Sequence, residues 1–108
     1  MVNVLDKIIQ DKKETLKEIK KKNSLDSIEN TIKSFNNFLN FKEVINKNKG
    51  TSLITEIKKA SPSAGELVKD FNHLNIAKMY VDNGATCLSV LTEEKHFLGK
   101  LDYIRDIK

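Results

Sequence analysis

The stretch Leu53–Gly65 reads Leu-Ile-Thr-Glu-Ile-Lys-Lys-Ala-Ser-Pro-Ser-Ala-Gly, and its two halves have different characters. The first half has the alternation of a β-strand, on which successive side chains point to opposite faces. We therefore predict a strand over residues 52–58. The second half is rich in serine, proline and glycine, which favour turns, so a turn is expected directly after the strand.

Glu56 and Lys58 share one face of this strand with Ile54 and lie near its carboxyl end. Same-face neighbours are about 7 Å apart at the backbone, so two long side chains of opposite charge can touch there or share a ligand. At the carboxyl end of a parallel strand, such residues usually serve a ligand. The alternative is an edge strand with a solvated Glu-Lys face, and the pattern by itself favours neither.

The first half of the chain is predicted to be helical. Apolar residues recur at helical spacing over residues 3–22. A second helix should follow, with Asp26 as its N-cap and Glu29 three positions later, and a short third helix should span residues 41–46. We expect three phenylalanines of this half to be ordinary core residues rather than lids over a ligand: Phe35, Phe38 and Phe41.

The second half is predicted to alternate strands and helices. A helix that starts at the N-cap Asn72 should end at Gly84, and residues 85–91 have the short apolar pattern of a buried parallel strand. A loop over residues 92–100 should precede another helix from Leu101 onward. This order is a βαβ unit with a right-handed crossover, which predicts the α/β class with a parallel sheet.

The size and composition of the chain suit one globular domain. It has 108 residues, of which 39% are hydrophobic and 31% are charged. No apolar run approaches the ~20 residues of a membrane span, and no basic-then-apolar leader opens the chain. Cys87 is the single cysteine, which excludes an internal disulfide and fits a reducing compartment. We predict a cytoplasmic protein in which Cys87 packs as a small hydrophobic residue.

The net charge of +4 comes from the first half of the chain. Residues 1–50 carry 11 lysines against 7 acidic residues, whereas residues 51–108 balance 8 basic with 8 acidic residues. A basic helix can attract nucleic acid or an anionic membrane, but here acids alternate with the lysines and no aromatic residues are interleaved for base stacking. We favour a solvated helix face, with neither nucleic acid nor membrane as a partner. His73 and His96, predicted to lie in loops, have no metal ligands at suitable spacing, so no metal site is expected.

Residues 51–108 resemble the indole-3-glycerol phosphate synthase family of tryptophan biosynthesis. The resemblance rests on the Glu-x-Lys-x-x-Ser-Pro-Ser run at residues 56–63, followed at the right distance by Ser-Val-Leu-Thr-Glu at 89–93 and Phe-Leu-Gly at 97–99. Residues 1–50 fit the family's helical N-terminal extension more loosely. The resemblance implies a (β/α)8 TIM barrel, of which residues 51–108 would form the first two β/α units.

The family's activity is that of a carboxy-lyase without metal or organic cofactor. It closes the indole ring of 1-(2-carboxyphenylamino)-1-deoxyribulose 5-phosphate, with loss of carbon dioxide and water. The resemblance implies that Lys58 holds the substrate carboxylate and helps to polarise the reacting centre, while Glu56 orients Lys58 and the substrate. It also implies that Ser61 binds the phosphate and that Phe97 lines the aryl pocket. The residues alone instead favour a turn in which Ser61 or Ser63 bonds only to its own backbone, and the resemblance is what favours the phosphate role for Ser61.

The sequence departs from the family pattern in small ways and in its length. Ala64 stands where members often carry lysine, and Lys100 stands where serine is common. A (β/α)8 barrel takes about 250 residues, so we expect this chain to be a fragment that is inactive alone and has a complementing barrel fragment as a possible partner. Two alternatives are another phosphate-binding barrel, such as phosphoribosylanthranilate isomerase, and a non-enzymatic basic helical binding module.

Overall fold

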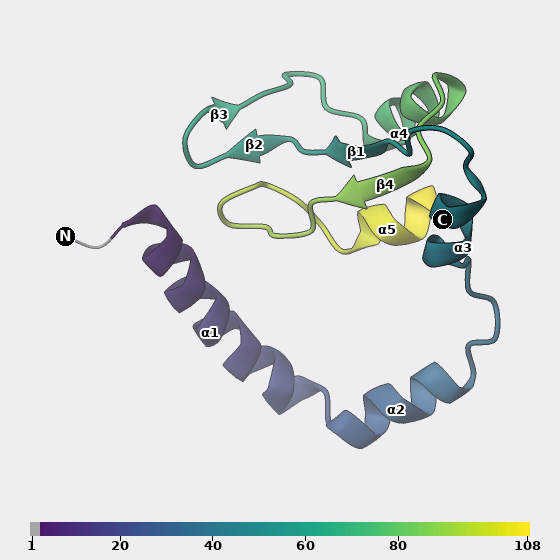
Figure 1. The fold of residues 1–108 in the computed structure, drawn as a ribbon. Coiled ribbons are helices and arrows are strands. Elements are labelled where there is room, and N and C mark those ends of the chain that lie inside the picture. Colours follow the sequence, from purple (N-terminus) through teal and green to yellow (C-terminus); the bar gives the residue numbers. More distant parts are fainter. Residues whose placement is uncertain (1–2) are drawn as a thin grey trace. The chain divides into compact units, whose positions relative to one another are not determined.

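The computed structural model describes residues 3–108, and the chain divides into two compact units, Met1–Leu39 and Asn40–Lys108. The first unit holds the helices α1 (Val4–Lys22) and α2 (Leu25–Lys33). The second holds α3 (Phe41–Lys47), β1 (Ile54–Ile57), β2 (Ala60–Ser61), β3 (Gly65–Glu66), α4 (His73–Asp82), β4 (Cys87–Val90) and α5 (Asp102–Ile107) (Figure 1). The second unit is therefore of the α/β class, as predicted.

Both helices of the first unit begin at side-chain caps. The Asn3 side chain accepts a hydrogen bond from the Asp6 backbone N–H at 2.8 Å, and Ser24 Oγ accepts one from the Ser27 N–H at 3.1 Å. The prediction of Asp26 as the N-cap of α2 is therefore wrong. Ser24 caps the helix because its hydroxyl reaches the N–H three residues on. Asp26 lies in the first turn, where its negative charge interacts favourably with the helix dipole.

The apolar residues predicted to form the core of the helical half are exposed. No residue of α1 or α2 is buried. Phe35 and Phe38 of the first unit are 55% and 68% exposed, and Phe41 of the second unit is 55% exposed, so the core expectation is wrong for all three. The helices carry more apolar surface than their own unit can cover, although the Phe35 and Phe38 rings do lie near each other at 6.1 Å.

The sheet that positions the candidate site is formed by β1 and β4. These strands pair in parallel, with Ile54 opposite Cys87 and Ile57 opposite Val90 (Figure 1). Backbone hydrogen bonds from Thr86 to Leu53 and from Leu91 to Ile57, at 2.8 and 3.1 Å, extend the pairing beyond the strand ends. Both predicted strands are thus confirmed with shorter bounds.

Burial of β4 is less complete than predicted. Cys87, Leu88 and Val90 are half-buried, and Ser89 is exposed. Among the described residues β4 pairs with β1 along one edge, which accounts for the partial burial. The Cys87 thiol is free and half-buried, so it is less tightly packed than a core residue.

Helix α4 connects the two parallel strands and packs against β1. It begins as predicted at Asn72, whose Oδ1 accepts a hydrogen bond from the Asn75 N–H at 2.9 Å. It ends at Asp82, and Gly84, the residue after the C-cap Asn83, has a φ of 93°, a conformation that glycine adopts at little cost. The Tyr80 hydroxyl donates to the Glu56 carbonyl oxygen at 3.1 Å.

A small core lies between β1, β2 and α4. Ile57, Ala60 and Ala77 are 1%, 4% and 6% exposed, and they are the buried hydrophobic residues of the described chain. Each comes from a different element of the second unit. The core therefore joins the strand that carries Glu56 to the turn after it and to the crossover helix.

The start of α4 is also tied to α5. His73 is the first residue of α4, so the prediction that it lies in a loop is wrong. Its ring stacks on Tyr103 with the centroids 4.2 Å apart, and its Nε2 lies 2.7 Å from Asp106 Oδ2. The Phe71 ring contacts the same tyrosine at 5.7 Å. These contacts hold α5, which follows the loop after β4, against the start of α4.

The turn after β1 is part of a short hairpin that the sequence did not predict. Ala60 pairs with Glu66 and Ser61 with Gly65 in an antiparallel arrangement. The tip of the hairpin is the predicted turn, at residues 62–64, and Gly65 follows it with a φ of 67°. No helix of residues 3–108 has the length and apolar character needed to cross a membrane.

Candidate active site

Glu56 and Lys58 meet at the carboxyl end of β1. The Lys58 Nζ lies 3.0 Å from Glu56 Oε1, as expected for two same-face neighbours. The side chains are 34% and 46% exposed, so an ion pair of this kind contributes only about 0–1 kcal/mol to stability. Both charges therefore remain accessible to a ligand, and stabilising the fold is a minor role for them.

Ser61 lies at the end of β2, three residues after Lys58. Its Oγ accepts a hydrogen bond from the Ala64 N–H at 3.2 Å and lies 3.4 Å from Ser63 Oγ. The hydroxyl thus bonds within its own turn, which is the alternative that the sequence left open. The bond to Ala64 uses an oxygen lone pair, so the Ser61 hydrogen can still be donated to Ser63 or to an anion.

Phe97 is half-buried on the loop that follows β4. Its backbone N–H donates to Glu93 Oε2 at 3.1 Å. Because β1 and β4 are parallel, the carboxyl ends of both strands lie at the same edge of the sheet, with Glu56 opposite Ser89. The sheet thus brings the Glu56–Lys58 pair and the Phe97 loop to one edge, while Ser61 and Phe97 make their hydrogen bonds within their own loops.

Glu93 organises the loop that carries Phe97. Besides the bond to Phe97, its carboxylate accepts hydrogen bonds from the N–H groups of Lys95 and His96, at 3.1 and 2.6 Å. Burial acts to raise the pKa of the Glu93 carboxyl, but the backbone N–H groups of His96, Phe97 and Lys95 outweigh it and hold the pKa below its usual value. Glu93 is therefore ionised at neutral pH.

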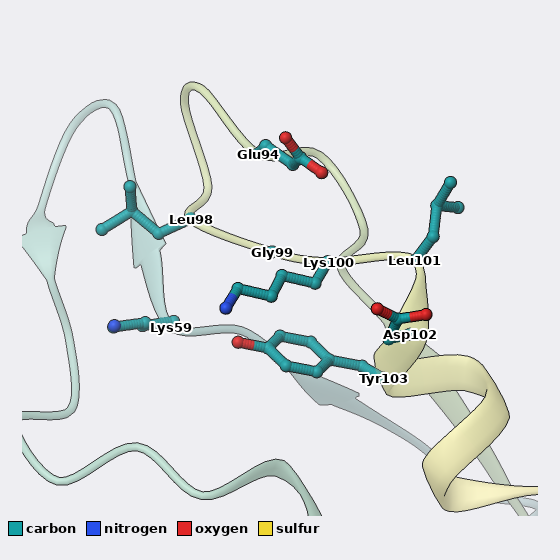
Figure 2. A pocket seen from close by; sticks show the side chains of 8 residues that line it. All are labelled: Lys59, Glu94, Leu98, Gly99, Lys100, Leu101, Asp102 and Tyr103. Carbon is teal, nitrogen blue, oxygen red and sulfur yellow. The ribbon is translucent and has the colours of Figure 1, made fainter.

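A cavity of about 590 Å³ opens beside this loop. Its walls come from the loop after β4 and the start of α5, with one residue from the segment after β1: Lys59, Glu94, Leu98, Gly99, Lys100, Leu101, Asp102 and Tyr103. Figure 2 shows the Lys100 ammonium and the Tyr103 hydroxyl both pointing to the side where Lys59 lies, whereas Leu101 points away. None of the four residues predicted for the site lines this cavity.

Sequence reasoning did not assign a role to two residues that hold the site in place. Glu93 could have been found as an acid that directly follows an apolar strand and precedes a loop with an aromatic residue. Tyr80 gave no such signal, because a tyrosine in the apolar stripe of a helix is usually a packing residue. Within residues 3–108, no group of three or more His, Cys, Asp or Glu side chains could hold a metal ion.

Comparisons with known proteins match nearly the whole chain. A sequence profile of the family described as indole-3-glycerol phosphate synthase matches residues 5–108. Among curated proteins of that name, the one from Clostridium acetobutylicum is 46% identical over 106 residues, and the one from Alkaliphilus metalliredigens is 43% identical over 105 residues. Each of these matches covers 97% of this chain. The one from Rhodopirellula baltica is 55% identical over 56 residues, which cover 52% of this chain and 22% of that protein.

The chain spans about 40% of the length of the Clostridium and Alkaliphilus relatives. The family profile nevertheless covers both the helical half and the Glu56–Lys58 strand with its following loops. The parallel pairing of β1 with β4 agrees with this match. The chain therefore belongs to the indole-3-glycerol phosphate synthase family.

Proposed function

We propose that this chain supplies part of the active site of an indole-3-glycerol phosphate synthase. The reaction is the closure of the indole ring of 1-(2-carboxyphenylamino)-1-deoxyribulose 5-phosphate, with loss of carbon dioxide and water. The observation that carries the proposal is the 3.0 Å contact between Lys58 Nζ and Glu56 Oε1 at the carboxyl end of a parallel strand. Ligands of α/β proteins bind at this end of the strands.

Lys58 is proposed to hold the carboxylate of the substrate and to stabilise negative charge that develops at the reacting carbonyl. Ring closure onto a carbonyl builds charge on oxygen, and a fixed ammonium group stabilises that charge. The Glu56 carboxylate would orient the Lys58 side chain, because the two charged groups lie 3.0 Å apart. The Tyr80 hydroxyl supports this arrangement by bonding the backbone carbonyl of Glu56.

Ser61 and Phe97 are proposed to bind the two ends of the substrate. The Ser61 hydroxyl would donate its hydrogen to a phosphate oxygen, since its existing bond to the Ala64 N–H uses only a lone pair. The half-buried Phe97 ring would pack on the carboxyphenyl group, because aromatic pairs are stabilised by more than the burial of their apolar area.

We also propose that β1 and β4 are the first two strands of a (β/α)8 barrel in the cytoplasm. Residues 1–50 would form a helical extension, and residues 51–108 would form the first two β/α units. The remaining barrel units would pack on the apolar surface that the described residues leave exposed. Support for this comes from the many large apolar side chains that the described residues leave exposed, such as Leu53 and Leu101 at 50% and 69%.

The proposal is tested in a chimera of the Clostridium acetobutylicum relative in which this chain replaces the matching 106-residue segment. We expect the chimera to form indole-3-glycerol phosphate. Removing a preorganised charge from an active site typically costs about 100-fold or more in kcat, so Lys58→Ala should lower kcat by at least that factor.

Lys69→Ala is the control, because Lys69 is an exposed lysine of the same unit that does not line the cavity beside the Phe97 loop. We expect it to keep kcat/KM within about threefold, as surface substitutions usually do. Equal losses in the two lysine variants, or an active Lys58→Ala chimera, would show that Lys58 is not the catalytic lysine of this segment.

A further inference from the structure

We infer that Glu93 is a positioning residue for Phe97, and that its carboxylate gives the loop after β4 the shape in which the phenylalanine ring meets the aryl part of the substrate. The inference rests on the proposed function, because it takes Phe97 as a wall of the aryl pocket. Glu93 itself would not touch the substrate.

The geometry of the carboxylate is the first support. Its two oxygens accept hydrogen bonds from three consecutive backbone N–H groups, at 3.1 Å for Lys95, 2.6 Å for His96 and 3.1 Å for Phe97. Hydrogen bonds to an ionised acceptor are roughly twice as strong as neutral ones. The last of the three fixes the backbone from which the Phe97 ring projects.

A backbone hydrogen bond also joins the two ends of the same loop. The Gly99 N–H donates to the carbonyl oxygen of Glu93 at 2.8 Å, so Glu93 binds the loop through both its backbone and its side chain. Between Glu93 and Gly99, Leu98 has a φ of 52°, in the left-handed region that non-glycine residues seldom adopt. A backbone conformation of this kind persists where surrounding bonds determine it, and clusters at functional sites.

A role for Glu93 as the general acid does not fit these contacts. Both oxygens are directed at the backbone of their own loop, and the same hydrogen bonds lower the pKa of the carboxyl. A general acid needs a pKa near the working pH, which means a raised value for a carboxyl group. The contacts therefore favour a group that stays ionised and holds the loop.

The test measures steady-state kinetics of four variants of the chimera defined above: Glu93→Ala, Phe97→Ala, the double variant, and Glu93→Gln as a milder change. Loss of an aromatic contact that binds substrate and transition state alike raises KM and spares kcat. Glu93→Ala and Phe97→Ala should each raise KM about tenfold with kcat within about threefold. The double variant should be no worse than Phe97→Ala, because both changes remove one contact. Glu93→Gln, which keeps a carbonyl acceptor, should raise KM by less.

The control is Lys95→Ala, which removes an exposed charged side chain of the same loop, keeps the backbone N–H that binds Glu93, and should leave KM unchanged. The inference is overturned if the Glu93 and Phe97 effects multiply, if Glu93→Ala acts mainly on kcat, or if both Glu93 variants keep the parent KM. If Phe97→Ala itself keeps the parent KM, the proposed role of Phe97 fails, and that result is separate from a failure at Glu93 alone.

Discussion

Gly99 approaches the backbone of Leu91 so closely that no side chain fits there. A Cβ added at Gly99 would meet the carbonyl oxygen of Leu91 and would lie 2.7 Å from its carbonyl carbon. The neighbour is backbone at the end of the β4 ladder, which cannot swing aside as a side chain can. The requirement for glycine at this position therefore comes from space rather than from φ.

We predict that Gly99→Ala destabilises the chimera by about 1–3 kcal/mol, the usual cost of forcing extra atoms into a packed site. The free energy of unfolding in urea measures it. Gly50→Ala is the matched control, because a Cβ at Gly50 meets nothing within 4 Å and its φ is not in the left-handed range. Equal stabilities of the two variants would contradict the role given to this close approach.

Glu93 should make stability depend on pH in the acid range. Its pKa is lower in the folded state than the ordinary value of 4.5, so its contribution is fully present above pH 4.5 and is lost as the pH falls through the lower folded value. We predict that the difference in unfolding free energy between the parent chimera and Glu93→Gln is largest near neutral pH and shrinks below pH 4.5. A difference that stays constant from pH 7 to about pH 3 would contradict this assignment.

At the scale of elements, the sequence predicts what local patterns determine. The apolar spacing of α1, the Asn72 cap of α4 and the strand that carries Glu56 all follow from residue types at short range. Ser24 was missed as a cap because Asp26 satisfies the same pattern two residues later. The β2–β3 hairpin was missed because its two-residue strands are too short to show alternation. The Glu93 contacts depend on loop geometry that no periodicity encodes.

Helix α4 offers a test of how much one cap contributes to the second unit. Asn72→Ala removes the acceptor of the 2.9 Å bond from the Asn75 N–H, and loss of such a cap costs about 1 kcal/mol. We predict a decrease of this size in the unfolding free energy of the chimera. Asn72→Asp keeps a side-chain acceptor and should stay within a few tenths of a kcal/mol of the parent. Equal losses in both variants would mean that Asn72 contributes something other than capping.

At the scale of the whole chain, exposed apolar surface dominates. In the first unit, Leu5, Leu25 and Leu39 are 63%, 69% and 82% exposed. In the second unit, burial of hydrophobic residues is confined to Ile57, Ala60 and Ala77 among the described residues. Apolar surface of this extent marks an interface, which the proposed barrel units would cover.

We predict that purified residues 1–108, without the rest of the chimera, bind the apolar dye ANS and self-associate as their concentration rises. Placing lysine on the apolar stripe of α1, in the double variant Leu5→Lys and Ile9→Lys, should lower both signals, because these side chains are 63% and 43% exposed. Lys13→Glu, on an exposed position of the same helix, is the control. Sedimentation velocity at several concentrations checks the association, and a monomer without dye binding would contradict the prediction.

The loop after β4 makes its principal bonds to itself, through the side chain and carbonyl of Glu93. The conformation of such a loop is determined mainly by bonds among its own residues, and little by the rest of the protein. Transplanted as a cassette from Leu91 to Gly99 into another member of the family, it should keep its shape without compensating changes in the recipient. Under the proposed role of Phe97, such a graft would move one wall of the aryl pocket from one relative to another.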